Sequence, residues 1–136
     1  MKSCLLLGDS KYLKKINFYL KKKNYKTKIE KKKVDIKIIQ KYDLVISYGY
    51  RFILKKSLLK FLKRPAINLH ISYLPYNRGA HPNFWSFFDK TPSGITIHEI
   101  DQGIDTGKII FQRKIFFNIN KNKNLTFKST YKTLNE

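Results

Sequence analysis

The chain has 136 residues, 42% hydrophobic and 15% aromatic, which is enough to build one ordinary domain but not two. Its single cysteine, Cys4, excludes an internal disulfide and a cysteine-rich zinc site. No apolar run reaches the ~18 residues of a membrane-spanning helix, and the opening apolar run is too short for a signal peptide. We therefore expect a soluble cytoplasmic domain.

The chain is strongly basic, because 29 Lys and Arg residues against 9 Asp and Glu residues give a net charge of +20. By itself this charge predicts a polyanionic partner such as RNA, DNA or a phosphorylated small molecule. However, lysines cluster in runs between Lys11 and Lys33 without the arginines that bidentate phosphate recognition favours. Lys, Ile and Asn also accumulate together in coding sequence rich in A and T, so we favour compositional drift over selected nucleic-acid binding.

The first part of the chain predicts a strand, a helix and a weaker second unit. Residues 3–7 are a short apolar run, and the Gly-Asp-Ser that follows is typical of a turn and a helix N-cap. Residues 11–23 then place apolar side chains on one helical face. Residues 26–41 are weakly patterned and predict a short strand and a short helix or turn.

The middle of the chain repeats this alternation more clearly. Residues 43–48 are a β-rich apolar run, residues 57–64 predict a helix that Pro65 closes, and residues 66–69 are again a short apolar run. Nearly continuous apolar strands covered by helices are typical of parallel sheets. We therefore expect an α/β fold with a doubly wound, mostly parallel sheet.

The last third changes character. Residues 95–100 and 108–117 alternate between apolar and polar side chains, and the glycine-rich segment 101–107 joins them, which predicts a β-hairpin. After a polar spacer, a further helical pattern begins at Thr126, and we expect that helix to be cut short. The aromatic residues after Pro82 predict a buried helix rather than a base-stacking platform; they are Phe84, Trp85, Phe87 and Phe88.

Three polar residues are the candidates for chemistry. Asn68 and His70 alternate at a strand end, where ligands bind in doubly wound sheets, and Asp105 lies in the glycine-rich loop. An amide and a protonated imidazole could stabilise the oxyanion formed when an amine attacks an acyl carbon. The Asp105 carboxylate could raise the pKa of His70 and help remove the amine proton. On spacing alone, a satisfied polar network at a strand end is favoured over a catalytic site.

Two longer motifs surround these residues. Asn-Leu-His-Ile-Ser-Tyr-Leu-Pro-Tyr-Asn-Arg-Gly-Ala at 68–80 is the first, and Gly-Ile-Thr-Ile-His at 94–98 with Asp-Gln-Gly-Ile-Asp-Thr-Gly-Lys-Ile-Ile at 101–110 is the second. Together they resemble the two motif blocks of the 10-formyltetrahydrofolate-dependent formyltransferases, closely over residues 43–111. The resemblance implies a Rossmann-like formyltransferase fold and a catalytic trio of Asn68, His70 and Asp105.

The resemblance also implies where the formyl donor, 10-formyltetrahydrofolate, would bind. Residues 47–53 resemble the segment whose backbone groups hold the pteridine ring, with the 101–105 loop on the other side of the ring; the implied binding residues are Arg51, Phe52, Ile53, Asp101, Gly103 and Ile104. Ordinary packing of the aromatic residues of the first segment stays an alternative. The substrate loop is expected to be shaped by Ser72, Arg78 and Gly79, and Arg78 is also a candidate for direct substrate contact.

No metal site is expected, because the histidines and the cysteine lack metal-ligand spacing. His98 is instead expected on the sheet surface. We expect one catalytic domain over residues 1–136, shortened on its N-terminal side, truncated at the C-terminus and without a separate tRNA-binding domain. The sequence makes no prediction of the oligomeric state.

The acceptor is expected to be a small primary amine. The Tyr-Asn-Arg-Gly-Ala at 76–80 resembles the tRNA and amino-sugar branches, whereas the Gly-Asp-Ser at 8–10 matches poorly the phosphate loop of glycinamide ribonucleotide formyltransferases. We therefore expect the amine of a nucleotide-linked amino sugar, with methionyl-tRNA as the second candidate. A truncated inactive remnant and a lysine-rich polyanion-binding module remain open alternatives.

Overall fold

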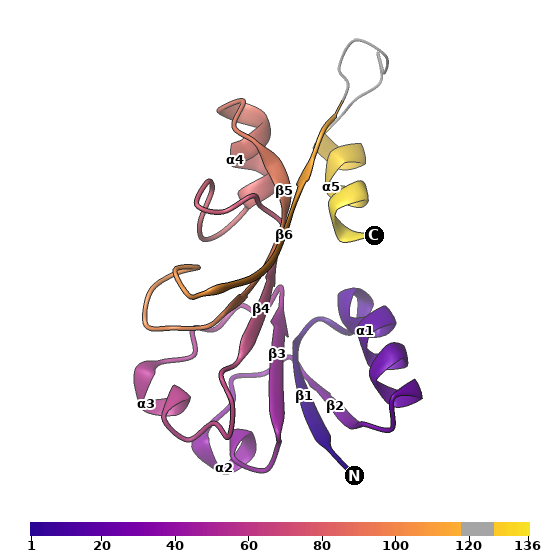
Figure 1. Cartoon of the computed structure of the whole chain (residues 1–136), viewed down its shortest axis with the longest axis vertical. Coiled ribbons are helices and arrows are strands. Elements are labelled where there is room, and N and C mark those ends of the chain that lie inside the picture. Colours follow the sequence, from indigo (N-terminus) through magenta and orange to yellow (C-terminus); the bar gives the residue numbers. More distant parts are fainter. Residues whose placement is uncertain (118–126) are drawn as a thin grey trace.

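The computed structural model describes residues 1–117 and 127–136, and Figure 1 shows their arrangement around one sheet. The polar spacer and Thr126, where the last helical pattern was predicted to begin, lie outside the described residues. The elements in chain order are β1 (Ser3–Gly8), α1 (Ser10–Lys22), β2 (Lys26–Glu30), α2 (Ile36–Ile39), β3 (Leu44–Tyr48), α3 (Lys56–Leu59), β4 (Ile67–His70), α4 (Pro82–Phe88), β5 (Ser93–Glu99), β6 (Ile109–Ile115) and α5 (Phe127–Asn135).

The sheet has six strands in the order β2-β1-β3-β4-β5-β6. Strands β1 to β4 pair in parallel, whereas β5 runs antiparallel to β4 and β6 runs antiparallel to β5. The predicted mostly parallel α/β sheet with a C-terminal hairpin is confirmed. Because β1, β3 and β4 are parallel, their carboxyl ends meet at one edge of the sheet, and the loops that follow them gather there.

Strands β1 and β3 at the centre of the parallel part of the sheet are buried on both faces, as their continuous apolar runs predict. In β1, Leu5 and Leu7 pack into one core with α2 and α3, while Cys4 and Leu6 pack with α1 into the other. Figure 1 shows α2 and α3 on the opposite side of the sheet from α1. Each fully buried leucine contributes about 1.5–3 kcal/mol of transfer free energy, so β1 is a main stabilising element of the fold.

Helix α1 follows from local signals. The Asp9 side chain accepts a hydrogen bond from the Lys11 backbone N–H at 3.1 Å, which satisfies one of the free donors at the helix start. The helix buries Leu13 and Leu20 against the sheet. It ends before Asn24, which adopts a positive φ of 59° that asparagine tolerates better than most residues.

The predicted helix over 57–64 is shorter than expected. Helix α3 ends at Leu59, and the backbone N–H groups of Phe61 and Leu62 then bond to carbonyls three residues back. No side chain caps its start, because Lys55 occupies the N-cap position. The apolar periodicity nevertheless marked residues that pack on the sheet, since Leu58 and Leu62 both contact that core.

Helix α4 forms where expected, but the prediction that its aromatic residues are buried is wrong. Its four aromatic side chains are between 43% and 69% exposed, and the ring of Phe84 stacks on that of Phe88. The helix instead buries Pro82, Asn83 and Ser86. Aromatic residues at four of seven positions cover more than one helical face, so periodicity could not indicate which face meets the sheet.

No helix among residues 1–117 and 127–136 is long and apolar enough to cross a membrane. Within the same part of the chain, no three His, Cys, Asp or Glu side chains are grouped as metal ligands.

Candidate functional site

The site lies on the face of the sheet that carries α2 and α3. Asn68 of β4 pairs in register with Ser47 of β3 on one side and with His98 of β5 on the other. Residues paired across neighbouring strands point to the same face, and His70 lies two positions further along β4. Asp105 reaches this row from the loop between β5 and β6, with a left-handed φ of 52°.

The Asp105 carboxylate is the centre of the site. Its Oδ1 accepts a hydrogen bond from Asn68 Nδ2 at 3.1 Å and lies 3.3 Å from His98 Nε2. Its Oδ2 accepts from the Gly79 backbone N–H at 2.8 Å and lies 3.6 Å from His70 Nε2. The structure thus brings together the three residues that the sequence singled out, and it adds His98 as a fourth.

His70 is buried, and its charge state differs from the expectation. Burial lowers the pKa of His70 below its ordinary value of 6.5, and the nearby Asp105 carboxylate and Asn77 carbonyl do not offset this. The expectation of a His70 held protonated by Asp105 is therefore wrong. Its Nε2 lies 3.0 Å from the Asn77 carbonyl oxygen, so Nε2 carries the proton and donates there. In neutral His70 this Nε2–H is the single N–H of the ring, so a substrate oxygen would have to compete with the Asn77 carbonyl for it.

His98 is almost fully buried at 2% exposure, so its predicted place on the sheet surface is wrong. Its Nδ1–H donates to the Glu99 carbonyl at 2.7 Å. Burial opposes its charge, but the hydrogen bond to Asp105, the Glu99 carbonyl and the charge of Asp101 outweigh burial and raise the pKa of His98. The alternation of β5 did indicate that Thr96 and His98 share one face of the sheet. This polar face suggested contact with solvent, but the loop that carries Asp105 covers it.

Asp105 is ionised at neutral pH despite its low exposure. Burial raises the pKa of this carboxyl group, but the hydrogen bond from His98, the neighbouring His70 ring and the Gly79 N–H together lower the pKa below its ordinary value of 3.8. The site therefore holds a carboxylate, a neutral imidazole and a second imidazole with increased basicity.

The loop after β4 is held by buried polar contacts. The Ser72 hydroxyl bonds to the Tyr76 carbonyl, and the Thr96 hydroxyl donates to the Ser72 carbonyl at 2.7 Å. Gly79 has a positive φ of 85°, which favours glycine and directs its N–H into the site. Ser72 and Gly79 thus shape this loop, whereas Arg78 is exposed and its contact with a substrate stays a prediction.

The segments implied for the formyl donor are both exposed. The backbone N–H and C=O groups of Arg51, Phe52 and Ile53 have no hydrogen-bond partner among the described residues, and the side chains of Phe52 and Ile53 are exposed. In the other segment, the Gly103 N–H and the Thr106 hydroxyl both bond to the Asp101 carboxylate, which stabilises the loop; Ile104 is exposed. Free backbone groups beside apolar side chains suit a flat heteroaromatic ring.

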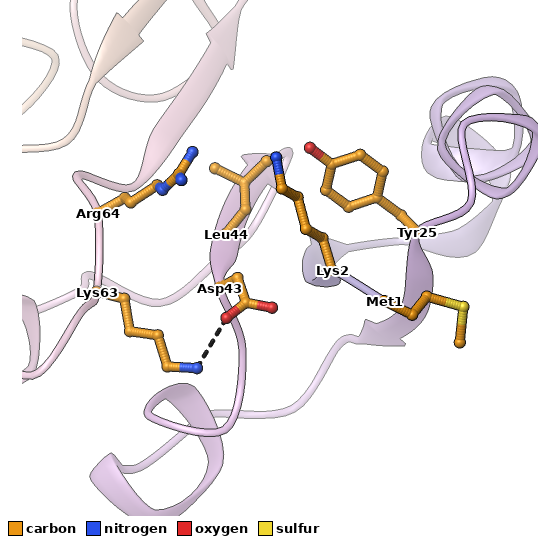
Figure 2. Close-up of a pocket in the computed structure, with 7 residues that line it drawn as sticks. All are labelled: Met1, Lys2, Tyr25, Asp43, Leu44, Lys63 and Arg64. Carbon is orange, nitrogen blue, oxygen red and sulfur yellow. Dashed lines mark hydrogen bonds and ion pairs between the residues drawn. The ribbon is translucent and has the colours of Figure 1, made fainter.

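A cleft of about 420 Å³ lies at the opposite edge of the sheet (Figure 2). It opens at the amino ends of the parallel strands, and its lining residues are Met1, Lys2, Tyr25, Asp43, Leu44, Lys63 and Arg64. Lys63 forms an ion pair with Asp43 at 2.8 Å. None of the residues predicted for catalysis or donor binding lines this cleft, so it is separate from the candidate site.

Comparisons with known proteins agree with the fold and the motifs. A family model described as formyl transferase matches residues 7–132. A solved formyltransferase, PseJ from Anoxybacillus kamchatkensis, in complex with UDP-4,6-dideoxy-4-formamido-L-AltNAc and tetrahydrofolate, is 42% identical with a TM-score of 0.87. That similarity covers 97% of this chain and 68% of PseJ. The expected Rossmann-like formyltransferase fold is confirmed.

Curated relatives match over a shorter region. The dTDP-4-amino-4,6-dideoxyglucose formyltransferase of Mycobacterium bovis is 39% identical over 77 residues, which are 57% of this chain and 32% of that protein. The methionyl-tRNA formyltransferase of Thermodesulfovibrio yellowstonii is 41% identical over 78 residues, 57% of this chain and 25% of that protein. The chain thus aligns with about a third or less of the length of these relatives.

Proposed function

Because the chain belongs to the formyl transferase family, we propose that it transfers a formyl group from 10-formyltetrahydrofolate to the primary amine of a nucleotide-linked amino sugar. The observation that carries this proposal is the arrangement at Asp105. An ionised carboxylate contacts both the Asn68 amide and the His70 imidazole at the carboxyl end of β4. An amide donor, an imidazole donor and a proton acceptor are the groups that acyl transfer to an amine requires.

In the proposed reaction, the acceptor nitrogen bonds to the formyl carbon, the bond from that carbon to folate N10 breaks, and one proton moves from the amine to N10. Asn68 would donate an N–H hydrogen bond to the formyl oxygen as negative charge develops on it. The His70 Nε2–H, which the Asn77 carbonyl accepts in the free protein, would turn to the same oxygen. Asp105 would accept the amine proton, which its ionised state at neutral pH allows. When bound, the folate supplies only the reactive formyl carbon.

The donor would bind between the two exposed segments. Arg51, Phe52 and Ile53 would present their free backbone groups to the pteridine ring, and Gly103 and Ile104 would cover its other side. This assignment is supported by the exposure of apolar side chains in both segments, which would otherwise stay in contact with water.

The amino-sugar acceptor is supported by the comparisons. PseJ was solved with a UDP-linked formamido sugar, and its similarity extends over 97% of this chain at 42% identity. The mycobacterial relative is named for a dTDP-linked amino sugar. Methionyl-tRNA is the second candidate, favoured by the 41% identity to a methionyl-tRNA formyltransferase over 78 residues.

We expect the chain to bind a stable folate analogue, 5-formyltetrahydrofolate, without any acceptor. At ~100 times the dissociation constant, binding stabilises the folded state by about 2.7 kcal/mol, which a thermal unfolding curve detects. The control ligand is p-aminobenzoylglutamate, which carries the same carboxylates without the pteridine ring. Equal shifts with both ligands would mean that the basic surface, not a folate site, binds them, and no shift with either would reject donor binding.

Formyl transfer is tested with 10-formyltetrahydrofolate and two acceptors, a UDP-linked 4-amino sugar and methionyl-tRNA. We expect mass spectrometry to detect the formylated sugar, and no formylated methionine released from the tRNA. Formylation of the tRNA alone would replace the proposed acceptor. If the chain binds the folate analogue but forms neither product, the enzymatic function is contradicted.

A further inference from the structure

We propose that His98 is a positioning residue of this site, whose Nε2 proton holds the Asp105 carboxylate in place and leaves an Asn68 N–H free for the substrate. This inference rests on the proposed formyl transfer. It concerns a residue that closes the first part of the second motif but that the sequence analysis expected on the sheet surface and not in the site. His98 touches two members of the proposed catalytic trio, through distances of 3.3 Å to Asp105 Oδ1 and 3.2 Å to Asn68 Nδ2.

The hydrogen-bond partners of His98 leave one nitrogen to titrate. Nδ1 faces the Glu99 carbonyl oxygen at 2.7 Å, which requires a proton on Nδ1 in every charge state. A change of charge therefore occurs at Nε2. This nitrogen faces an acceptor, Asp105 Oδ1, and a donor, Asn68 Nδ2, at nearly equal distances.

The Nε2 proton decides what Asn68 does. When Nε2 is protonated, it donates to Asp105, and Asn68 also donates one N–H to Asp105 at 3.1 Å. The second N–H of the Asn68 amide is then free for a formyl oxygen. When Nε2 is unprotonated, it accepts an N–H from Asn68 and takes that donor away from the substrate. Protonated His98 therefore supports both the oxyanion donor and the proton acceptor.

The surroundings of His98 favour its protonated form. The charged and titratable groups that face it are Asp105 and Asp101 of the loop and His70 of β4, whose ring centroid lies 6.3 Å away. Two carboxylates and the Glu99 carbonyl outweigh burial at His98, whereas His70 is held neutral. A proton on His98 Nε2 thus places a positive charge beside Asp105 at a position that is 2% exposed.

The test uses His98→Gln, whose amide can still donate a hydrogen bond but cannot carry the charge. Loss of one charge-assisted hydrogen bond predicts a kcat about 10- to 100-fold lower. Removing the cation raises the pKa of Asp105, so the acidic limb of the kcat profile moves to higher pH. A purely structural role would lower kcat at every pH and leave the limb in place. Lys63→Gln, which removes the ion pair at the opposite edge of the sheet, is the matched control.

NMR titration of the histidine C2–H signals separates this inference from the proposed function, because it needs no activity. We expect the pKa of His98 to lie above 6.5 and to fall in Asp105→Asn, and the pKa of His70 to rise in His98→Gln, which removes a neighbouring charge. A pKa of His98 that Asp105→Asn leaves unchanged would overturn the inference. So would a kcat of His98→Gln within twofold of the parent. Absence of transfer by the parent would reject the proposed function instead.

Discussion

Replacing His70 by Asn is expected to remove nearly all formyl transfer while the chain remains folded. The loss of a donor to the developing oxyanion costs about 2.7–4 kcal/mol of transition-state stabilisation, or about 10²–10³-fold in kcat. The Asn77 carbonyl, which His70 Nε2–H now satisfies at 3.0 Å, loses that donor or receives a poorer one. We therefore expect a cost in unfolding free energy of about 1–3 kcal/mol as well.

Steady-state kinetics and thermal unfolding of the same preparations separate these two effects. His70→Asn should bind 5-formyltetrahydrofolate with nearly the parental affinity, because the segments proposed for the donor are not changed. Lys63→Gln again serves as a control for the loss of a polar contact elsewhere. A variant that retains more than a tenth of the parental kcat would remove His70 from the mechanism.

Asp105→Asn is expected to have an effect of several orders of magnitude on turnover, with a much smaller effect on folate affinity. Asparagine has nearly the same size and tolerates the same left-handed backbone, so the φ of 52° adds no strain. The amide cannot accept the amine proton, however. Both oxygens of the Asp105 carboxylate face N–H groups: Asn68 and His98 approach Oδ1, and the Gly79 N–H approaches Oδ2. The NH₂ group of the new asparagine therefore faces another donor whichever oxygen it replaces. Turnover equal to that of the parent would reject the catalytic role.

The same substitution is also expected to change how the free energy of unfolding depends on pH. The pKa of folded His98 is raised above its ordinary value of 6.5, so His98 contributes stability that is present below that pH and lost as the pH rises through the folded pKa. The pKa of folded His70 is lowered, so His70 makes the free energy of unfolding smaller as the pH falls below 6.5. The free energy of unfolding should therefore fall above pH 6.5 in the parent, and this fall should be nearly absent in Asp105→Asn.

Much of the fold and the centre of the site could be predicted from the sequence. The continuous apolar runs of β1 and β3 indicated parallel strands, because both faces of such strands are buried. The alternation of β5 and β6 indicated a hairpin. The motif residues Asn68 and His70 were assigned to a strand end, and the fold brings Asp105 to them as expected.

The boundaries and faces of the short helices could not be predicted equally well. Helix α3 ends at Leu59, and the chain continues in turns whose N–H groups bond three residues back while Leu62 packs against the core. Helix α4 has aromatic residues on more than one side, so only contact with its neighbours determines that Asn83 and Ser86 are buried. Local propensity says little about such elements, because tertiary packing supplies most of their stability.

The sequence by itself determined the element order, the two motifs and therefore the residue types at the site. Only the tertiary structure decided the charges there. Pairing of β4 with β5 sets His98 opposite Asn68, and the loop that carries Asp105 covers both, so a polar strand face that suggested solvent is buried. Burial disfavours a charge on His70, while contact with Asp105 favours one on His98. A pKa depends on the distances to neighbouring charges and on exclusion from water, and both are properties of the folded chain.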